Sequence, residues 1–176
     1  MGNIIIKIDG KLIIILDFEK IVTDISPETG LKVTDIEQLG TRRETNIPIV
    51  LAEDSALLRK LIIESLKKSG YENIFKAENG QEAWEYICKC RDNGTIEKDV
   101  KLLITDIEMP LMDGHRLTKL AKSDDTIKQI PLIIFSSLVN EEMKKKGESL
   151  GADAQLSKPE IGNLVRIVDD LVKKLK

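Results

Sequence analysis

Short apolar runs alternate with longer amphipathic stretches from Ile47 to the C-terminus. The runs are rich in Ile, Leu and Val and predict buried strands of a parallel sheet. We expect strands at Ile47–Glu53, Ile74–Ala77, Leu102–Asp106, Leu132–Ser136 and Ala154–Lys158. We expect helices at Ser55–Ser69, Gln81–Cys90, Gly114–Lys122, Asn140–Leu150 and Ile161–Lys176, with a long polar loop at Arg91–Lys101. This alternation predicts an α/β fold with a doubly wound, five-stranded parallel sheet.

The residues before this region have a different pattern. Two apolar runs, Asn3–Ile8 and Lys11–Leu16, flank Asp9-Gly10, a strong two-residue hairpin signal. Short helices are expected at Asp17–Asp24 and Leu31–Leu39. A lone hairpin with a short helix is barely stable in water, so this segment must pack on the second domain, pair with another chain, or belong to a larger domain. We therefore expect an N-terminal segment at 1–40, a linker at 41–46 and a full domain at 47–176.

Polar side chains stand at the ends of four of the predicted strands. Glu53-Asp54, Asp106, Ser136 and Lys158 each close an apolar run. In a parallel α/β sheet the carboxyl ends of the strands line one crevice, where ligands bind. Three carboxylates, one hydroxyl and one ammonium would therefore converge there. This set suits the binding of a divalent cation and the acceptance of a phosphoryl group.

Composition excludes several classes of function. The net charge of −3 over 176 residues leaves no basic footprint for nucleic acid. The longest apolar runs have only about five residues, whereas a membrane span needs ~20, so we expect no membrane insertion. No signal peptide is evident, and we therefore expect a cytoplasmic location.

Cys88 and Cys90 lie on different faces of a predicted helix, which favours free thiols over a disulfide.

The second domain resembles the response-regulator receiver domain. Motifs in the family order carry the resemblance: Ile-Val-Leu-Ala-Glu-Asp-Ser at 49–55, Ile-Thr-Asp-Ile-Glu-Met-Pro-Leu-Met-Asp-Gly at 104–114, Ile-Phe-Ser-Ser at 134–137, Gly-Ala-Asp at 151–153 and Lys-Pro at 158–159. The resemblance implies a flavodoxin-like sheet with strand order 2-1-3-4-5. The run Ile-Asp-Gly-Lys-Leu-Ile-Ile-Ile-Leu-Asp-Phe-Glu-Lys-Ile-Val at 8–22 resembles the C-terminal end of a CheW-like coupling domain. Together the two parts are similar to the CheV family of chemotaxis coupling proteins, and Met1-Gly2 before such a segment indicates a truncated coupling domain.

The resemblance assigns a role to each polar residue at the strand ends. Asp106 would be the phosphoacceptor, and Lys158 and Ser136 would bind the phosphoryl oxygens. Mg²⁺ would be held by Glu53, Asp54, Asp106 and the backbone carbonyl of Glu108. Oxygen ligands with retained waters are what Mg²⁺ favours.

Simpler roles stay open for some of these positions. Asp54 or Ser55 could cap the first helix, a role compatible with metal binding. Asp113 and Gly114 are typical of a helix start and a turn. His115, the one histidine, is expected to be an exposed or partly packed helix residue.

The chain departs from the receiver pattern at two positions. Gln155 stands where many receivers place an aromatic switch residue, three positions before the lysine. Leu138 stands two residues after Ser136, where an apolar side chain cannot orient an attacking water, so we expect slow self-dephosphorylation. Lys144–Lys146 form a basic cluster on the fourth helix, which we interpret as a solvated face. The resemblance implies that the face of the fourth helix, fifth strand and fifth helix passes on the effect of phosphorylation.

The sequence therefore predicts a signalling module rather than a turnover enzyme. It would take a phosphoryl group from a histidine kinase and either modulate the coupling of chemoreceptors to the kinase or serve as a phosphate sink. Coupling proteins are further expected partners. One alternative is an assembly or pseudo-receiver module that forms a homodimer through the apolar hairpin. Another is a phosphohydrolase with an aspartyl nucleophile, in which Glu108 would act as acid/base.

Overall fold

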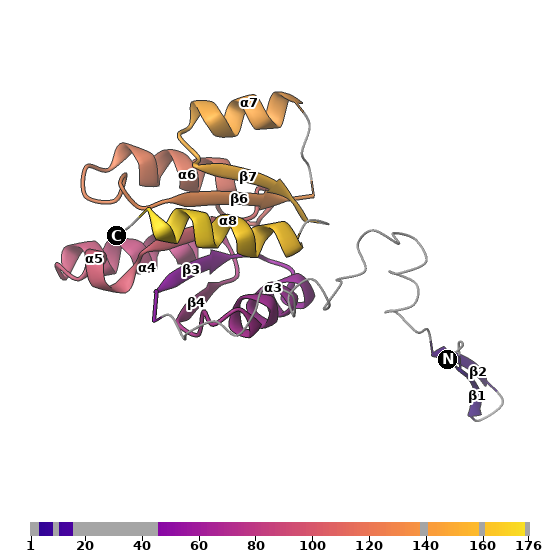
Figure 1. Cartoon of the computed structure of the whole chain (residues 1–176). Helices are drawn as coiled ribbons and strands as arrows, with labels where there is room; N and C mark the ends of the chain where they lie inside the picture. The colour runs from indigo at the N-terminus through magenta and orange to yellow at the C-terminus, as the bar shows by residue number, and fades with distance from the viewer. Residues whose placement is uncertain (1–3, 9–10, 16–45, 138–140, 159–160, 175–176) are drawn as a thin grey trace. The chain divides into compact units, whose positions relative to one another are not determined.

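The computed structural model describes residues 4–8, 11–15, 46–137, 141–158 and 161–174 (Figure 1). The chain divides into two compact units, Met1–Lys32 and Val33–Lys176, which are described separately. The helices expected at Asp17–Asp24 and Leu31–Leu39, and all but the last residue of the expected linker, lie outside the described residues.

The described part of the first unit is a pair of antiparallel strands. β1 (Ile4–Ile8) pairs with β2 (Lys11–Ile15), with Ile6 opposite Ile13. These strands confirm the two arms of the hairpin expected on either side of Asp9-Gly10.

The second unit contains a five-stranded sheet in which all strands are parallel. Its strands are β3 (Ile49–Ala52), β4 (Ile74–Ala77), β5 (Leu102–Thr105), β6 (Leu132–Ser136) and β7 (Ala154–Ser157). Their spatial order is β4-β3-β5-β6-β7. Counted within this unit, the order is 2-1-3-4-5, which confirms the flavodoxin-like sheet.

All five expected helices are present, with small shifts at their ends. They are α3 (Ala56–Lys68), α4 (Gly80–Asp92), α6 (Gly114–Ser123), α7 (Glu141–Ser149) and α8 (Ile161–Lys173). The expectation of a polar loop throughout 91–101 was wrong, because a one-turn helix, α5 (Ile96–Asp99), lies within it. Ile96 is buried and anchors this turn, whereas its charged neighbours hide any helical periodicity in the sequence.

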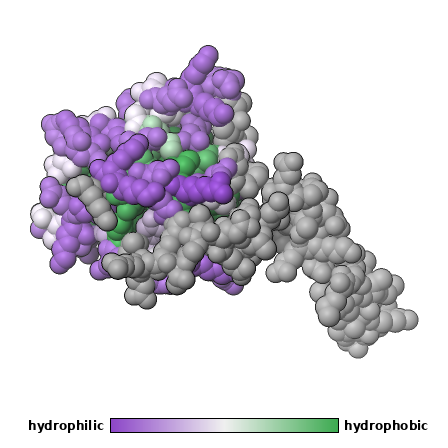
Figure 2. Space-filling model, viewed as in Figure 1, coloured by the Kyte–Doolittle hydropathy of each residue, from purple (hydrophilic) through white to green (hydrophobic). Residues whose placement is uncertain are grey.

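Helices cover both faces of the sheet, as Figure 1 shows. α3 and α8 contact each other on one face, and α4 contacts α6 and α5 on the other. The strand positions alternate between the two faces. Thus Val50 and Leu103 join the core cluster under α4 and α6, and Leu51 and Ile104 point the opposite way. The face drawn in Figure 2 is mainly hydrophilic where the residues are coloured, with a smaller apolar area near its centre.

Candidate functional site at the carboxyl end of the sheet

The neighbouring strands β3 and β5 bring the three predicted carboxylates together. The backbone N–H of Asp106 donates to the carbonyl of Ala52 (2.9 Å), and that of Glu53 donates to Ala77 (3.1 Å), so the ladder continues one residue past each strand. Oxygen atoms of Glu53, Asp54 and Asp106 all lie within 4.8 Å of one another. This is the position where the strand order reverses, the usual ligand site of open α/β sheets.

Lys158 reaches the same cluster from the end of β7. Its Nζ donates to Asp106 Oδ2 at 2.7 Å and lies 3.1 Å from the Glu53 carboxylate. The Lys158 side chain is 10% exposed, and those of Asp106 and Glu53 are 3% and 1% exposed. Hydrogen bonds between ionised groups are strong when water is excluded, so this ammonium joins the ends of β3, β5 and β7.

Burial and neighbouring charges shift the pKa values of Glu53 and Lys158 in the site. Burial raises the pKa of the Glu53 carboxyl above its usual value; Lys158 counteracts this in part, and the charge of Asp106 adds to the rise. Burial alone would lower the pKa of Lys158, but the hydrogen bond from Lys158 to Asp106 and the attraction of Glu53 outweigh it and raise that pKa. The folded site therefore favours the charged form of Lys158 and disfavours the charged form of Glu53.

Asp106 is fixed on its other side by the backbone. Its Oδ1 accepts from the N–H of Ile107 at 2.6 Å, and its carbonyl accepts from the hydroxyl of Thr105 at 2.8 Å. The N-terminus of α6 packs directly against it, because a Cβ on Gly114 would overlap the carbonyl oxygen of Asp106. The carboxylate therefore has one orientation, toward Lys158 and the two acidic neighbours.

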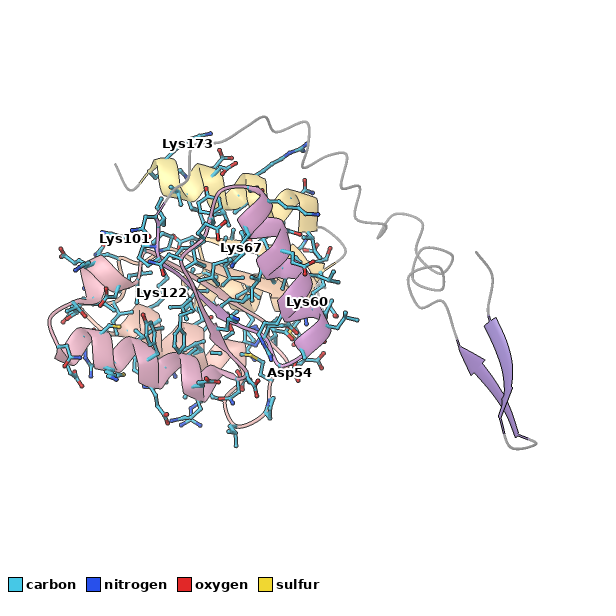
Figure 3. All side chains as sticks on the ribbon, turned by 90° about the horizontal axis from the view of Figure 1, so that it is seen from below. Asp54, Lys60, Lys67, Lys101, Lys122 and Lys173 are labelled. Atoms are coloured by element: carbon cyan, nitrogen blue, oxygen red, sulfur yellow. The ribbon has the colours of Figure 1, made fainter. Side chains whose placement is uncertain are left out.

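The turn from β3 to α3 presents Asp54 to solvent. Ser55 caps α3, since its Oγ accepts from the N–H of Leu58 at 3.4 Å, which confirms the cap expected at this point. Figure 3 labels Asp54 beside the start of α3. Arg59, one turn into the helix, donates to the carbonyl oxygens of Glu53 (2.6 Å) and Asp54 (3.3 Å). The contacts of Arg59 were not expected from the sequence, where its only signal is a cationic residue in the first turns of the helix that follows the acidic pair.

The loop after β5 is closed at its base by the N–H of Gly114, which donates to Ile107 at 2.9 Å. Glu108 is exposed in this loop. Leu111 has a φ of 63° and is 81% exposed. The N–H of Met112 donates to Pro110 across it at 2.7 Å, forming a tight three-residue turn that a bulky side chain strains. At the other end of the loop Asp113 caps α6, because its Oδ1 accepts from the backbone N–H of Arg116 at 2.8 Å.

The remaining expected residues line the ends of β6 and β7. Ser136 is the last residue of β6, lies opposite Ser157 and is fully buried. Both amide atoms of the Gln155 side chain are buried with no hydrogen-bond partner among the described residues. The Gln155 oxygen lies against Gly147 of α7, at the point where a Cβ would stand. Leu138 lies outside the described residues.

His115 was expected to be exposed or partly packed, and this was wrong: it is only 6% exposed on α6. Its Nε2 has no hydrogen-bond partner in the described parts of the chain. Burial lowers the pKa of His115, Lys146 of α7 lowers it further, and Asp113 opposes the change. The sequence could not show this, because a histidine next to a helix cap carries no pattern of burial.

The donor set of the cluster fits a hard divalent cation. Three carboxylates stand against one ammonium, which leaves excess negative charge, and oxygen atoms are the ligands that Mg²⁺ prefers. Asp54 is exposed while Glu53 and Asp106 are buried, so one side of the cluster faces water. Such an arrangement lets a cation keep several waters while it neutralises charge on an incoming anionic group.

Comparisons with known proteins agree with this geometry. The family model of the response regulator receiver domain matches residues 49–169. The chain is 37% identical over 89 residues to the chemotaxis protein CheY1 of Helicobacter pylori, which covers 51% of this chain and 66% of CheY1. It is 29% identical over 167 residues to the chemotaxis protein CheV1 of the same species, which covers 94% of this chain and 50% of CheV1. The chain therefore spans half the length of CheV1.

Solved structures show the same fold. The receiver domain of a Francisella response regulator has a TM-score of 0.65 at 28% identity, over 74% of this chain and all of that domain (100%). Within the described residues, no helix combines the length and the apolar character needed to cross a bilayer.

Proposed function

Because the chain belongs to the response regulator receiver domain family, we propose that it accepts a phosphoryl group on the carboxylate of Asp106. The observation that carries the proposal is the contact of Lys158 with Asp106, 2.7 Å long, inside a cluster of three carboxylates. A buried ammonium beside a carboxylate offsets charge that develops on a transferred phosphoryl group. Receiver domains are phosphoacceptors rather than turnover enzymes, and we extend this to the present chain.

Each residue of the cluster has a part in this reaction. The carboxylates of Glu53, Asp54 and Asp106 would hold Mg²⁺, together with the backbone carbonyl of Glu108. When bound, Mg²⁺ supplies positive charge to the phosphoryl oxygens. Lys158 pairs with the same oxygens as a point charge, and the Ser136 hydroxyl donates to them once the group is attached. The N–H of Ile107 keeps the Asp106 carboxylate in its orientation.

The donor is a phosphohistidine of a histidine kinase. The Asp106 oxygen forms a bond to phosphorus as the bond from phosphorus to the donor imidazole breaks, and the electron pair returns to that nitrogen. Similarity to CheY1 and CheV1 supports a role in chemotaxis signalling in the cytoplasm. There the protein would modulate the coupling of receptors to the kinase or act as a sink for phosphoryl groups.

We further propose that residues 1–40 are the end of a CheW-like coupling domain, with a linker at 41–46 and the receiver domain at 47–176. The alignment with CheV1 supports this, since it covers 94% of the chain and so extends beyond the residues that the receiver family model matches.

Intact-mass measurement after incubation with acetyl phosphate and Mg²⁺ tests the phosphoacceptor role. We expect the wild-type chain to gain the mass of one phosphoryl group and Asp106→Asn to gain none. Removal of Mg²⁺ with a chelator should abolish the adduct on the wild type. An unmodified wild-type chain would instead favour the pseudo-receiver alternative. Steady turnover of small phosphate esters would favour a phosphohydrolase that uses Glu108.

A further inference from the structure

Arg59 contacts the main chain of both acidic residues that follow β3. Its Nη1 donates to the carbonyl oxygen of Glu53 at 2.6 Å and to that of Asp54 at 3.3 Å. Its Nη2 donates to Oε1 of Glu78 at 3.0 Å. The Arg59 side chain is 13% exposed, so it is a packed group rather than a surface cation. One guanidinium thus joins the ends of β3 and β4 through three bonds.

These carbonyl groups lie where the sheet no longer supplies partners. The β3–β5 pairing ends at Ala52 and Thr105, and the N–H of Asp106 is the last donor from β5 to β3. The next helical bond begins only at Ser55, whose carbonyl accepts from the N–H of Arg59 at 2.8 Å. Glu53 and Asp54 therefore stand between two hydrogen-bonded elements, and the partly buried carbonyl of Glu53 needs another donor in this gap.

Arginine suits this position because its planar guanidinium group donates several hydrogen bonds in fixed directions. Glu78, at the end of β4, holds one arm of the guanidinium, so the other arm stays on the carbonyls of the acidic pair. The Lys158 ammonium holds the Glu53 carboxylate from the β7 side. The Glu53 residue is thus fixed at its backbone by one cation and at its side chain by another.

We propose that Arg59 is a positioning residue for the Mg²⁺ site, and that Glu78 orients it. The inference rests on the proposed function, because it concerns how that site is held. Arg59 donates to the backbone carbonyls of Glu53 and Asp54, so it acts on the path of the main chain from which two of the ion-binding carboxylates project. Residues that orient metal ligands commonly change metal affinity by about 10- to 100-fold when they are replaced.

Titration calorimetry of Mg²⁺ into the metal-free chain tests the proposal. We expect Arg59→Met, which keeps the length of the aliphatic stem, to weaken Mg²⁺ binding about tenfold. Glu78→Gln keeps the shape of an exposed side chain and leaves Arg59 in place, so it should fold normally and weaken binding by a smaller factor. Arg91→Met is the matched control, since Arg91 is another arginine held by acidic side chains, and its partners, Asp92 and Asp124, are not among the three acidic residues of the site.

Phosphorylation kinetics separate positioning from a general loss of structure. The Mg²⁺ concentration for half-maximal labelling by acetyl phosphate should rise in Arg59→Met, while the rate at saturating Mg²⁺ stays near that of the wild type. In the metal-free state, backbone amides of residues 53–58 should exchange with deuterium faster in Arg59→Met than in Arg91→Met.

Mg²⁺ affinity equal to the wild type in both Arg59→Met and Glu78→Gln would overturn the inference while leaving the proposed function intact. If Arg59→Met does not fold, Glu78→Gln alone decides. A wild-type chain that binds no Mg²⁺ and takes no phosphoryl group would overturn the proposed function and this inference with it.

Discussion

Three residues of the second unit, Glu53, His115 and Gln155, bury polar groups at a cost in folding free energy. Glu53 is buried beside Asp106, and its raised pKa shows that the folded chain disfavours its charge despite Lys158. His115 and Gln155 bury polar atoms that lack partners among the described residues. Leaving such an atom unpaired costs about 1–3 kcal/mol. Costs of this kind are common near functional sites, where chemistry rather than packing selects the residue.

His115 makes the stability of the protein sensitive to acid. Its pKa is lowered in the folded chain, so the unfolded chain takes up a proton more readily. The contribution to the free energy of unfolding is therefore fully present above the ordinary pKa of 6.5 and is lost as the pH falls from there toward the folded value. Asp113, which caps α6, and Lys146 on α7 are the charged groups that act on His115, in opposite directions.

Replacement of His115 by leucine tests this. We expect His115→Leu to raise the free energy of unfolding by about 1 kcal/mol at neutral pH, because an unpaired buried nitrogen is removed. The gain should grow as the pH falls toward about 5, where the wild type loses stability through the histidine. Urea unfolding of both chains at several pH values measures it. A difference between them that does not change with pH would contradict the titration of His115.

At the scale of elements, the junction of β5 with α6 decides where Asp106 lies. Gly114 starts α6 directly against the Asp106 carbonyl, and its N–H bonds to Ile107. A methyl group there would push on backbone rather than on the end of a flexible side chain. The position of the carboxylate and the packing of the helix are therefore coupled.

We expect Gly114→Ala to lower the free energy of unfolding by about 3 kcal/mol, since overpacking at a rigid site forces the backbone to shift. The same shift should slow labelling by acetyl phosphate, because it moves Asp106 relative to Lys158. Gly162→Ala is the control: apart from its chain neighbours and the backbone of its own helix, no atom of the described residues lies within 4 Å of a Cβ at Gly162 in α8, so its stability should be unchanged or slightly higher. Urea unfolding and mass measurement check both. Equal effects of the two substitutions would show that the contact at Gly114 is not specific.

Regular alternation made most elements of the second unit predictable. β4 and β6 were predicted with their observed bounds, and α6 begins at Gly114 as expected, because apolar runs and Asp113 mark them clearly. α5 could not be predicted, since a single turn with one buried residue has no periodicity. The ends of the predicted strands indicated that the three carboxylates and Lys158 would converge. They did not indicate that Arg59 would donate to the backbone of the acidic pair, or that His115 would be buried. Those outcomes depend on contacts between segments far apart in the sequence.

At the scale of the whole molecule, the first unit raises the question of self-association. β1 and β2 form a sheet of two strands, so in the described part of this unit each strand has one edge without a strand partner. Exposed strand edges of apolar sequence favour pairing with another chain. Two-stranded sheets alone are marginally stable, which adds to the tendency.

We expect the full chain to form a dimer at high concentration and Ile13→Pro to shift it toward the monomer. Proline removes a backbone donor from β2 and disrupts the pairing, whereas Ile13→Val should behave like the wild type. Light-scattering mass as a function of concentration measures this. A wild-type chain that stays monomeric throughout would rule out self-pairing through the hairpin.

The adjacency of β3 and β5 has a consequence for how this surface tolerates mutation over time. β3 and β5 pair along their whole length, and the last backbone bond of this ladder, from the N–H of Asp106 to the carbonyl of Ala52, lies where the acceptor and its acidic neighbours stand. Substitutions that accumulate in the outer helices can change most of the surface without altering the distance between the two strands at that bond. Sequences with little identity can therefore keep the same arrangement of charges, provided that the pairing of the central strands is retained.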